Sequence, residues 1–117
     1  MKDERTDYQR REAAEDARQD AMCARYPADV RRLYDLWRSN TDASDIAGQI
    51  LRAAHAKCGP VELSGLWRLD RVNLGAALRI ITMFGYPSLL SDRGLTIGPE
   101  GEPLMTAAEV KRLLDGD

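Results

Sequence analysis

GPVELSGLWRLDRVNLGAALRIITMFG, residues 59–85, is the most apolar stretch of an otherwise polar chain. Its second half carries apolar residues on a helical period: Leu74, Ala77, Leu78, Ile81 and Phe84, with Ile80 and Met83 beside them. This spacing places them on one face of a helix. Asp70 is suited to cap that helix, and Gly85 with Pro87 to end it. We therefore predict a buried helix over residues 70–84.

The segment just before this helix is crowded with large apolar residues: Leu63, Leu66, Trp67 and Leu69. This density favours a short turn-like segment held in the core over a free loop. Burial of each such side chain contributes about 1.5–3 kcal/mol. We expect Trp37, Trp67 and Phe84 to be core residues whose loss unfolds the protein.

The N-terminal part of the chain is rich in charged residues and alanine, and no glycine or proline occurs before Pro27. Residues 1–26 are therefore predicted to form a charged helical arm. Pro27 is expected to break the chain or to open the next helix. Residues 28–39 carry Val30, Leu33, Tyr34 and Trp37 on one helical face, and they begin a domain that spans 27–117.

Two further helices complete the predicted domain. Residues 43–57 are predicted to form a helix that Asp42 or Ser44 caps. Gly48 would allow a neighbouring helix to approach closely. The buried face of this helix is expected to consist of Ile46, Ala47, Ile50, Leu51 and Ala54. Residues 95–105 are predicted to form a hairpin, because Gly98-Pro-Glu-Gly101 is a turn signal. Thr106 and Glu109 form a capping box for a helix over 107–114. The expected fold is one small, mainly α domain of about five helices with one short β-hairpin near its C-terminus.

The composition restricts the kinds of partner. The net charge is −2, and residues 81–117 carry three basic and six acidic groups, so no overall basic field attracts nucleic acid. No apolar run is long enough to span a membrane, and the N-terminal sequence lacks the apolar segment of a secretion signal. We expect a cytoplasmic protein with reduced cysteines.

The chain offers few candidates for chemistry. Its single histidine, His55, lies three residues before Cys58, and Cys23 is the other thiol. A structural zinc site generally needs four ligands, and a thiol–histidine pair needs proximity that spacing alone does not give. No phosphate-binding glycine motif occurs. We therefore expect no metal, no cofactor and no enzymatic activity.

A DNA-binding transcriptional regulator is the alternative. Residues 28–39, 43–57 and 70–84, followed by the 95–105 hairpin, match the element order of a winged helix, with Arg71 and Arg79 on the helix that would enter the groove. This helix has few cations, however, and Glu100 and Glu102 at the tip of the wing would repel phosphates.

Protein binding is the function that these exclusions leave. We expect the contacts on exposed faces of the two N-terminal helices, at Tyr8, Arg11, Arg31, Arg32 and Arg38. Trp37 is assigned to the core instead.

Residues 61–70 also resemble a family of small uncharacterised proteins carried by proteobacterial integrative elements, plasmids and prophages. The shared pattern is an acidic residue, Leu, Thr or Ser, and then spaced leucines ending in Leu-Asp, here Glu62, Leu63, Ser64, Leu66, Leu69 and Asp70. The resemblance covers about residues 43–85, and the charged arm and the 95–117 tail depart from it. It carries over no functional residue. It implies an accessory protein of a mobile element, and such genes often encode inhibitors of host defence, including anti-CRISPR proteins, or small regulators.

Overall fold

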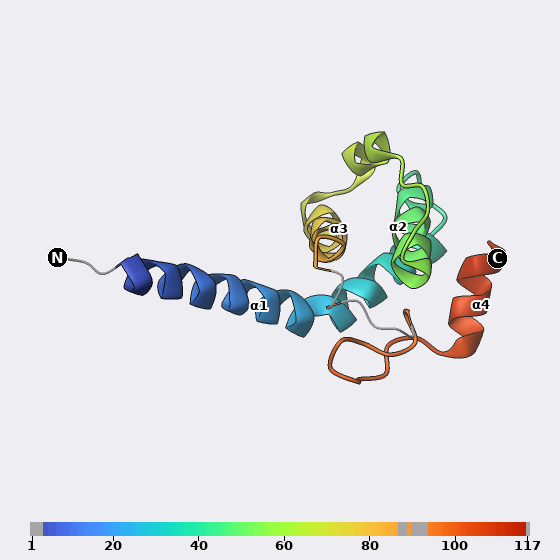
Figure 1. Cartoon of the computed structure of the whole chain (residues 1–117). Coiled ribbons are helices and arrows are strands. Elements are labelled where there is room, and N and C mark those ends of the chain that lie inside the picture. The colour runs from blue at the N-terminus through green and yellow to red at the C-terminus, as the bar shows by residue number, and fades with distance from the viewer. Residues whose placement is uncertain (1–3, 87–88, 90–93, 117) are drawn as a thin grey trace.

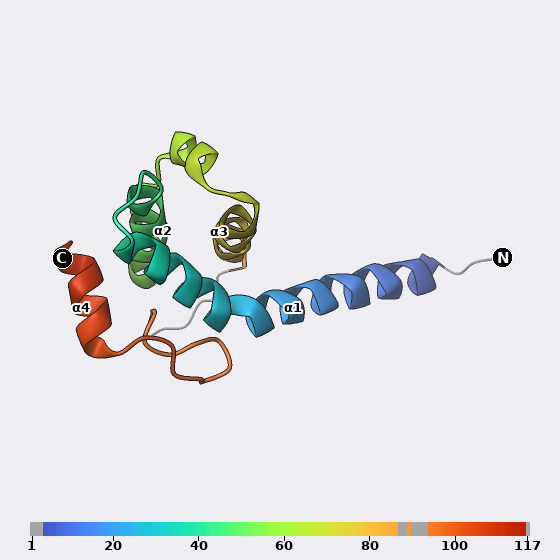
Figure 2. The same cartoon turned by 180° about the vertical axis from the view of Figure 1, so that it is seen from behind.

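Helix α1 (Glu4–Arg38) is the longest element, and the other helices gather around its C-terminal half (Figure 1). This computed structural model describes residues 4–86, 89 and 94–116, with side chains from Asp7 onward. The N-terminal half of α1 projects from the body, as the view from behind also shows (Figure 2). The molecule therefore measures 60 Å along its longest axis against 30 and 21 Å along the others.

The predicted break at Pro27 is wrong, because α1 continues through this proline. An interior proline costs a helix about 3 kcal/mol, since it lacks an N–H and its ring crowds the preceding turn. Burial on both sides of Pro27 offsets this cost. Met22, Tyr26, Val30 and Leu33 follow one another at helical spacing and are all buried. A break at residue 27 would separate these contacts, so the helix continues through the proline.

Helix α2 (Ser44–Ala56) packs against both α1 and α3. The buried face predicted for it is confirmed at all five positions: Ile46, Ala47, Ile50, Leu51 and Ala54. The close approach expected at Gly48 is also found, because a Cβ there would lie 2.8 Å from Cδ1 of Trp37 on α1. The glycine therefore makes room for the half-buried indole.

The predicted cap of α2 is wrong, since the residue at the N-cap is Ala43 and its side chain makes no capping bond. The Ser44 hydroxyl donates instead to the Leu36 carbonyl at 3.0 Å and accepts from the Thr41 N–H at 2.7 Å. These two bonds close the short connection from α1 to α2.

Helix α3 (Arg71–Met83) begins as predicted, with the Asp70 carboxylate accepting from the Asn73 N–H at 2.8 Å. Its buried face differs from the predicted stripe. The fully buried residues are Ala76, Ala77, Ile80 and Met83. Leu74, Ile81 and Phe84 pack at the margin of the core, and Leu78 is exposed. Two of the four fully buried residues are alanines, whose small side chains allow α3 to pack closely on its neighbours α1 and α2.

The segment before α3 forms the 3₁₀ helix η1 (Leu63–Arg68). The prediction that Trp67 lies in the core is wrong, because its side chain is 93% exposed. A 3₁₀ helix has three residues per turn, so Leu66 and Leu69 share one side and Trp67 stands about a third of a turn away. Leu69 is buried and Leu66 packs on the core, which leaves Trp67 facing outward.

The predicted β-hairpin over residues 95–105 is also wrong. This segment has a single isolated bridge, between Ile97 and Pro103, and the described residues contain no strand. Pro99 and Pro103 lack the N–H groups that a longer ladder would need. Buried Leu95 and Met105 fix the two ends of the loop to the core. Helix α4 (Ala107–Asp115) then starts with the predicted capping box of Thr106 and Glu109.

The predicted mainly α fold of about five helices is confirmed in class. The two helices expected over residues 1–26 and 28–39 are a single helix, α1, and the 3₁₀ helix η1 brings the number back to five. None of the helices in the described residues is long and apolar enough to cross a membrane.

Candidate interaction surface

Exposed apolar side chains concentrate at η1 and the start of α3. Trp67 is 93% exposed, Leu63 66% and Val72 56%. The other large apolar side chains that are exposed in the described residues stand singly on α1, α3 and α4, at Tyr8, Leu78 and Leu114. We refer to Leu63, Trp67 and Val72 as the η1 surface. The helix η1 lies on the side of the body away from α1, beyond α2 and α3 (Figure 1).

The backbone under this surface is firmly anchored to α2. The Glu62 N–H donates to Oε1 of Gln49 at 2.8 Å, which fixes the start of η1. Gly65 lies directly on Ile46, and a Cβ at residue 65 would lie 2.9 Å from the Ile46 Cβ. The buried side chain of Leu69 and the cap at Asp70 hold the other end. Trp67 is therefore an exposed ring on an ordered support.

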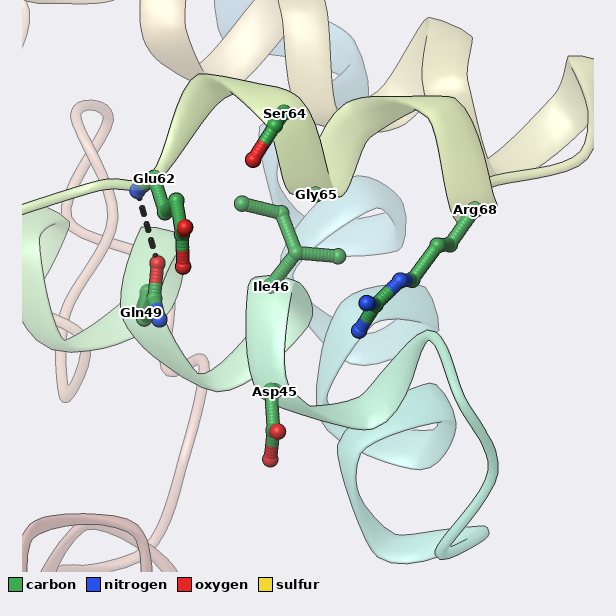
Figure 3. A pocket seen from close by; sticks show the side chains of 7 residues that line it. All are labelled: Asp45, Ile46, Gln49, Glu62, Ser64, Gly65 and Arg68. Carbon is green, nitrogen blue, oxygen red and sulfur yellow. Dashed lines mark hydrogen bonds between the residues drawn. The ribbon is translucent and has the colours of Figure 1, made fainter.

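A small pocket opens beside this surface, between α2 and η1 (Figure 3). Its volume is about 80 Å³. Ile46 and Gly65 close its base, and the Ser64 hydroxyl points over it (Figure 3). Glu62 and Gln49 lie on one side of the pocket and Arg68 lies on the other (Figure 3). Nη1 of Arg68 donates to the Asp42 carbonyl at 3.5 Å. Asp45 completes the lining.

The residues predicted to bind a partner do not form one site. Tyr8 and Arg11 are exposed on the projecting part of α1, and twenty residues of continuous helix separate Arg11 from Arg31, about 30 Å. Arg31 and Arg32 line an open groove of about 530 Å³ that also includes Asn73 of α3.

Arg31 is also engaged within the molecule. Its guanidinium donates to both carboxylate oxygens of Glu109 on α4, at 2.6 and 3.2 Å. These bonds, with one from the Thr106 N–H, lower the pKa of Glu109 to about 2. Arg38 donates to the Tyr34 hydroxyl at 3.5 Å and is otherwise exposed. Arg31 is thus a structural residue as much as a surface one.

The candidate residues for catalysis or metal binding are His55, Cys58 and Cys23. Nδ1 of His55 accepts from the Leu95 N–H at 3.2 Å, which ties the segment after residue 94 to α2. Cys58 is exposed, and Cys23 is buried, which raises the pKa of its thiol. The described residues contain no group of three or more side chains that would hold a metal ion.

The two arginines of the DNA-binding alternative also differ in role. Arg71 is exposed, whereas Arg79 makes a paired hydrogen bond with the buried carboxylate of Asp29. Arg79 therefore holds α3 on α1, and its charge is already paired. The wing of that alternative has no strands in the part of the chain described here.

Reasoning from the sequence missed the η1 surface because it assigned Trp67 to the core. In the sequence, the three-residue spacing of Leu66 and Leu69 puts Trp67 out of phase with them, but only the contact of Gly65 with α2 shows which side faces the core. Comparisons with models of protein families, with curated protein sequences and with solved structures found no match to this chain.

Proposed function

We propose that this protein acts without catalysis, by binding another protein through the η1 surface. The observation that supports this proposal is Trp67, which is almost fully exposed although its backbone is anchored. Tryptophan is enriched among the residues that dominate the binding energy of protein interfaces. A large apolar side chain with no role in the core, on an ordered support, is typical of a docking site.

The energy available at this position is substantial. Covering an indole ring buries about 150–250 Å², which corresponds to about 4–6 kcal/mol before the costs of association are subtracted. The anchored backbone reduces one of these costs, because η1 does not need to become ordered on binding. Leu63 and Val72 are the other exposed large apolar side chains of η1 and the first turn of α3.

The resemblance of residues 61–70 suggests which kind of partner to seek. The motif that carries it, from Glu62 to Asp70, coincides with η1 and the cap of α3. We propose that the protein is an accessory factor of a mobile element and that its partner belongs to a host defence complex in the cytoplasm. The arginines predicted from the sequence, above all the exposed Arg32 and Arg38, are candidates for a secondary contact.

Affinity capture from a bacterial host lysate tests this proposal. Wild-type protein, Trp67→Ala and Leu114→Ala serve as baits, since Leu114 is an exposed apolar residue on α4, away from η1. We expect one stoichiometric protein that wild type and L114A retain and W67A loses, and the purified pair should then form a complex. A partner that W67A retains equally would contradict the assignment of the η1 surface. Retention of nuclease-sensitive nucleic acid alone would favour the regulator instead.

A further inference from the structure

Helix α3 has a second apolar face besides the one that packs on α1 and α2. Leu74, Leu78 and Ile81 follow one another at i, i+4 and i+7, which places them in one row along the helix. Leu78 is 45% exposed, and the other two are half-buried. In Figures 1 and 2, α2 lies on one side of α3 and α1 runs below it, and no described element covers the side away from α2. We refer to this row, with Thr82 beside it, as the outer face of α3.

The outer face carries no unpaired charge. Between Val72 and Tyr86 the only charged residue is Arg79, in a chain of which 31% of the residues are charged. Its guanidinium donates two hydrogen bonds to the carboxylate of Asp29 on α1, so this charge is neutralised within the molecule. Depletion of charged residues distinguishes the core of a protein interface from the rest of a protein surface. The outer face of α3 therefore has the composition of an interface core.

We propose that the outer face of α3 binds the same face of a second copy of this protein, with the two helices antiparallel. A twofold contact brings each charge of a surface close to its own copy, so a surface with net charge repels itself. A face without unpaired charge avoids this repulsion. Leu78 lies near the middle of the face and would meet its own copy across the twofold axis.

The charges at the two ends of α3 favour the antiparallel arrangement. Arg71 is exposed in the first turn, at one end of the outer face. At the other end, the Tyr86 hydroxyl donates to the carboxylate of Glu15 on α1, and residues 11–18 around it carry three acids and two arginines. Leu78 lies about midway between residues 71 and 86, about 10–12 Å from each. An antiparallel pair centred on it places Arg71 of each copy next to the acidic end of the other, whereas a parallel pair places Arg71 against its own copy.

The proposed contact is small. Helix α3 has 13 residues and is about 20 Å long. One such helix packed on its copy buries less than the roughly 1,200–2,000 Å² of a stable protein interface. We therefore expect a dimer that dissociates in the micromolar range and is in exchange with the single chain. This contact is separate from the η1 surface, so it does not depend on the partner proposed above.

Sedimentation equilibrium of the full-length protein from about 1 to 500 µM tests the proposal. We expect the mass to rise with concentration from that of one 13.1 kDa chain toward that of two. Leu78→Glu should remain a single chain over this range, because the twofold contact would bring the two new carboxylates together. Leu114→Glu is the matched control, since Leu114 on α4 is 49% exposed against 45% for Leu78, and it should dimerise like wild type.

Two further variants test the orientation. Arg71→Glu should weaken the dimer about tenfold, and R71E/E15R, which exchanges the two charges, should regain most of that loss. Circular dichroism of each variant separates loss of self-association from loss of the fold. An R71E protein that dimerises like wild type would overturn the antiparallel arrangement.

The inference as a whole fails if the wild-type protein is a single chain at every concentration, or if folded L78E dimerises as well as L114E does. A dimer that W67A loses and L78E keeps would also overturn it, because self-association would then belong to the η1 surface.

Discussion

Arg79 of α3 donates two hydrogen bonds to the carboxylate of Asp29 on α1, from Nε to Oδ2 at 2.7 Å and from Nη2 to Oδ1 at 2.8 Å. The Asp29 side chain is only 6% exposed. The pair joins the two helices two residues after Pro27. It satisfies a charge that would otherwise be buried alone.

Loss of this partner should destabilise the fold. We expect Arg79→Ala to lower the free energy of unfolding by about 2–3 kcal/mol, because it leaves the Asp29 carboxylate buried and unpaired. Urea denaturation followed by circular dichroism measures the change. Arg71→Ala is the control, since this exposed arginine on the same helix should change stability by about 0.5 kcal/mol or less. Equal effects of the two substitutions would show that the pair contributes little.

The ion pair between Arg31 and Glu109 should make stability depend on pH. The pKa of Glu109 is about 2 in the folded protein against 4.5 ordinarily, so the unfolded chain takes up this proton more readily. The stability that this difference provides is complete above about pH 5 and is lost as the pH falls from there toward 2. Because the Arg31 side chain is 44% exposed, solvent screening reduces it to about 1 kcal/mol.

Glu109→Gln isolates this effect, because glutamine can still complete the capping box. We expect the variant to be about 1 kcal/mol less stable than wild type near neutral pH and the difference to shrink at about pH 3. Urea denaturation of both proteins at the two pH values measures it. A difference that stays constant with pH would mean that the charge of Glu109 is not its cause.

Removal of the proline inside α1 should stabilise the protein. Pro27→Ala restores a backbone N–H and relieves the crowding of the preceding turn, which favours the helix by about 1–3 kcal/mol. Thermal unfolding should show a higher midpoint. Pro99→Ala, in the loop before α4, should give no such gain. A destabilised P27A protein would indicate that the proline sets a bend that the core requires.

Substitution by alanine should affect stability differently at Gly65, which is closely packed on α2, and at Gly75 in α3. Gly65→Ala would place its Cβ 2.9 Å from the Ile46 Cβ, so η1 has to shift and stability should fall by about 1–3 kcal/mol. Gly75→Ala in the interior of α3 would place its Cβ 3.3 Å from Nη1 of Arg79, whose guanidinium is held by Asp29, so this tight contact offsets the gain in helix propensity and stability should stay within about 0.5 kcal/mol of wild type. Chemical denaturation of both variants distinguishes them. A tolerated G65A would mean that η1 is loosely held.

The sequence predicted those features that depend on local chemistry. The cap at Asp70, the capping box at Thr106 and the buried face of α2 need only neighbouring residues and a helical period. Pro27 was misassigned because its local cost is offset by contacts with other helices, which spacing alone does not reveal. The hairpin was overpredicted because a turn signal and flanking apolar residues do not determine whether a ladder forms.

The candidate surface was missed for a related reason. The spacing alone does not decide whether Trp67 points inward, since periods of three and of 3.6 residues both place Leu66 and Leu69 together and Trp67 to one side of them. The close contact of Gly65 with α2 decides which side faces the core, and that contact joins residues 19 positions apart. Exposure of Trp67 is thus a tertiary property.

The two tryptophans should consequently respond in opposite ways. Trp37 packs on Tyr34, with ring centroids 5.6 Å apart, and on Gly48 of α2, so Trp37→Ala should cost about 3 kcal/mol or more. Trp67→Ala should leave the free energy of unfolding within about 0.5 kcal/mol of wild type. In single-tryptophan variants, acrylamide should quench the fluorescence of Trp67 strongly and that of Trp37 weakly. A blue-shifted, protected Trp67 in dilute protein would contradict its exposure, and protection that appears only on addition of the partner would identify this ring as the contact.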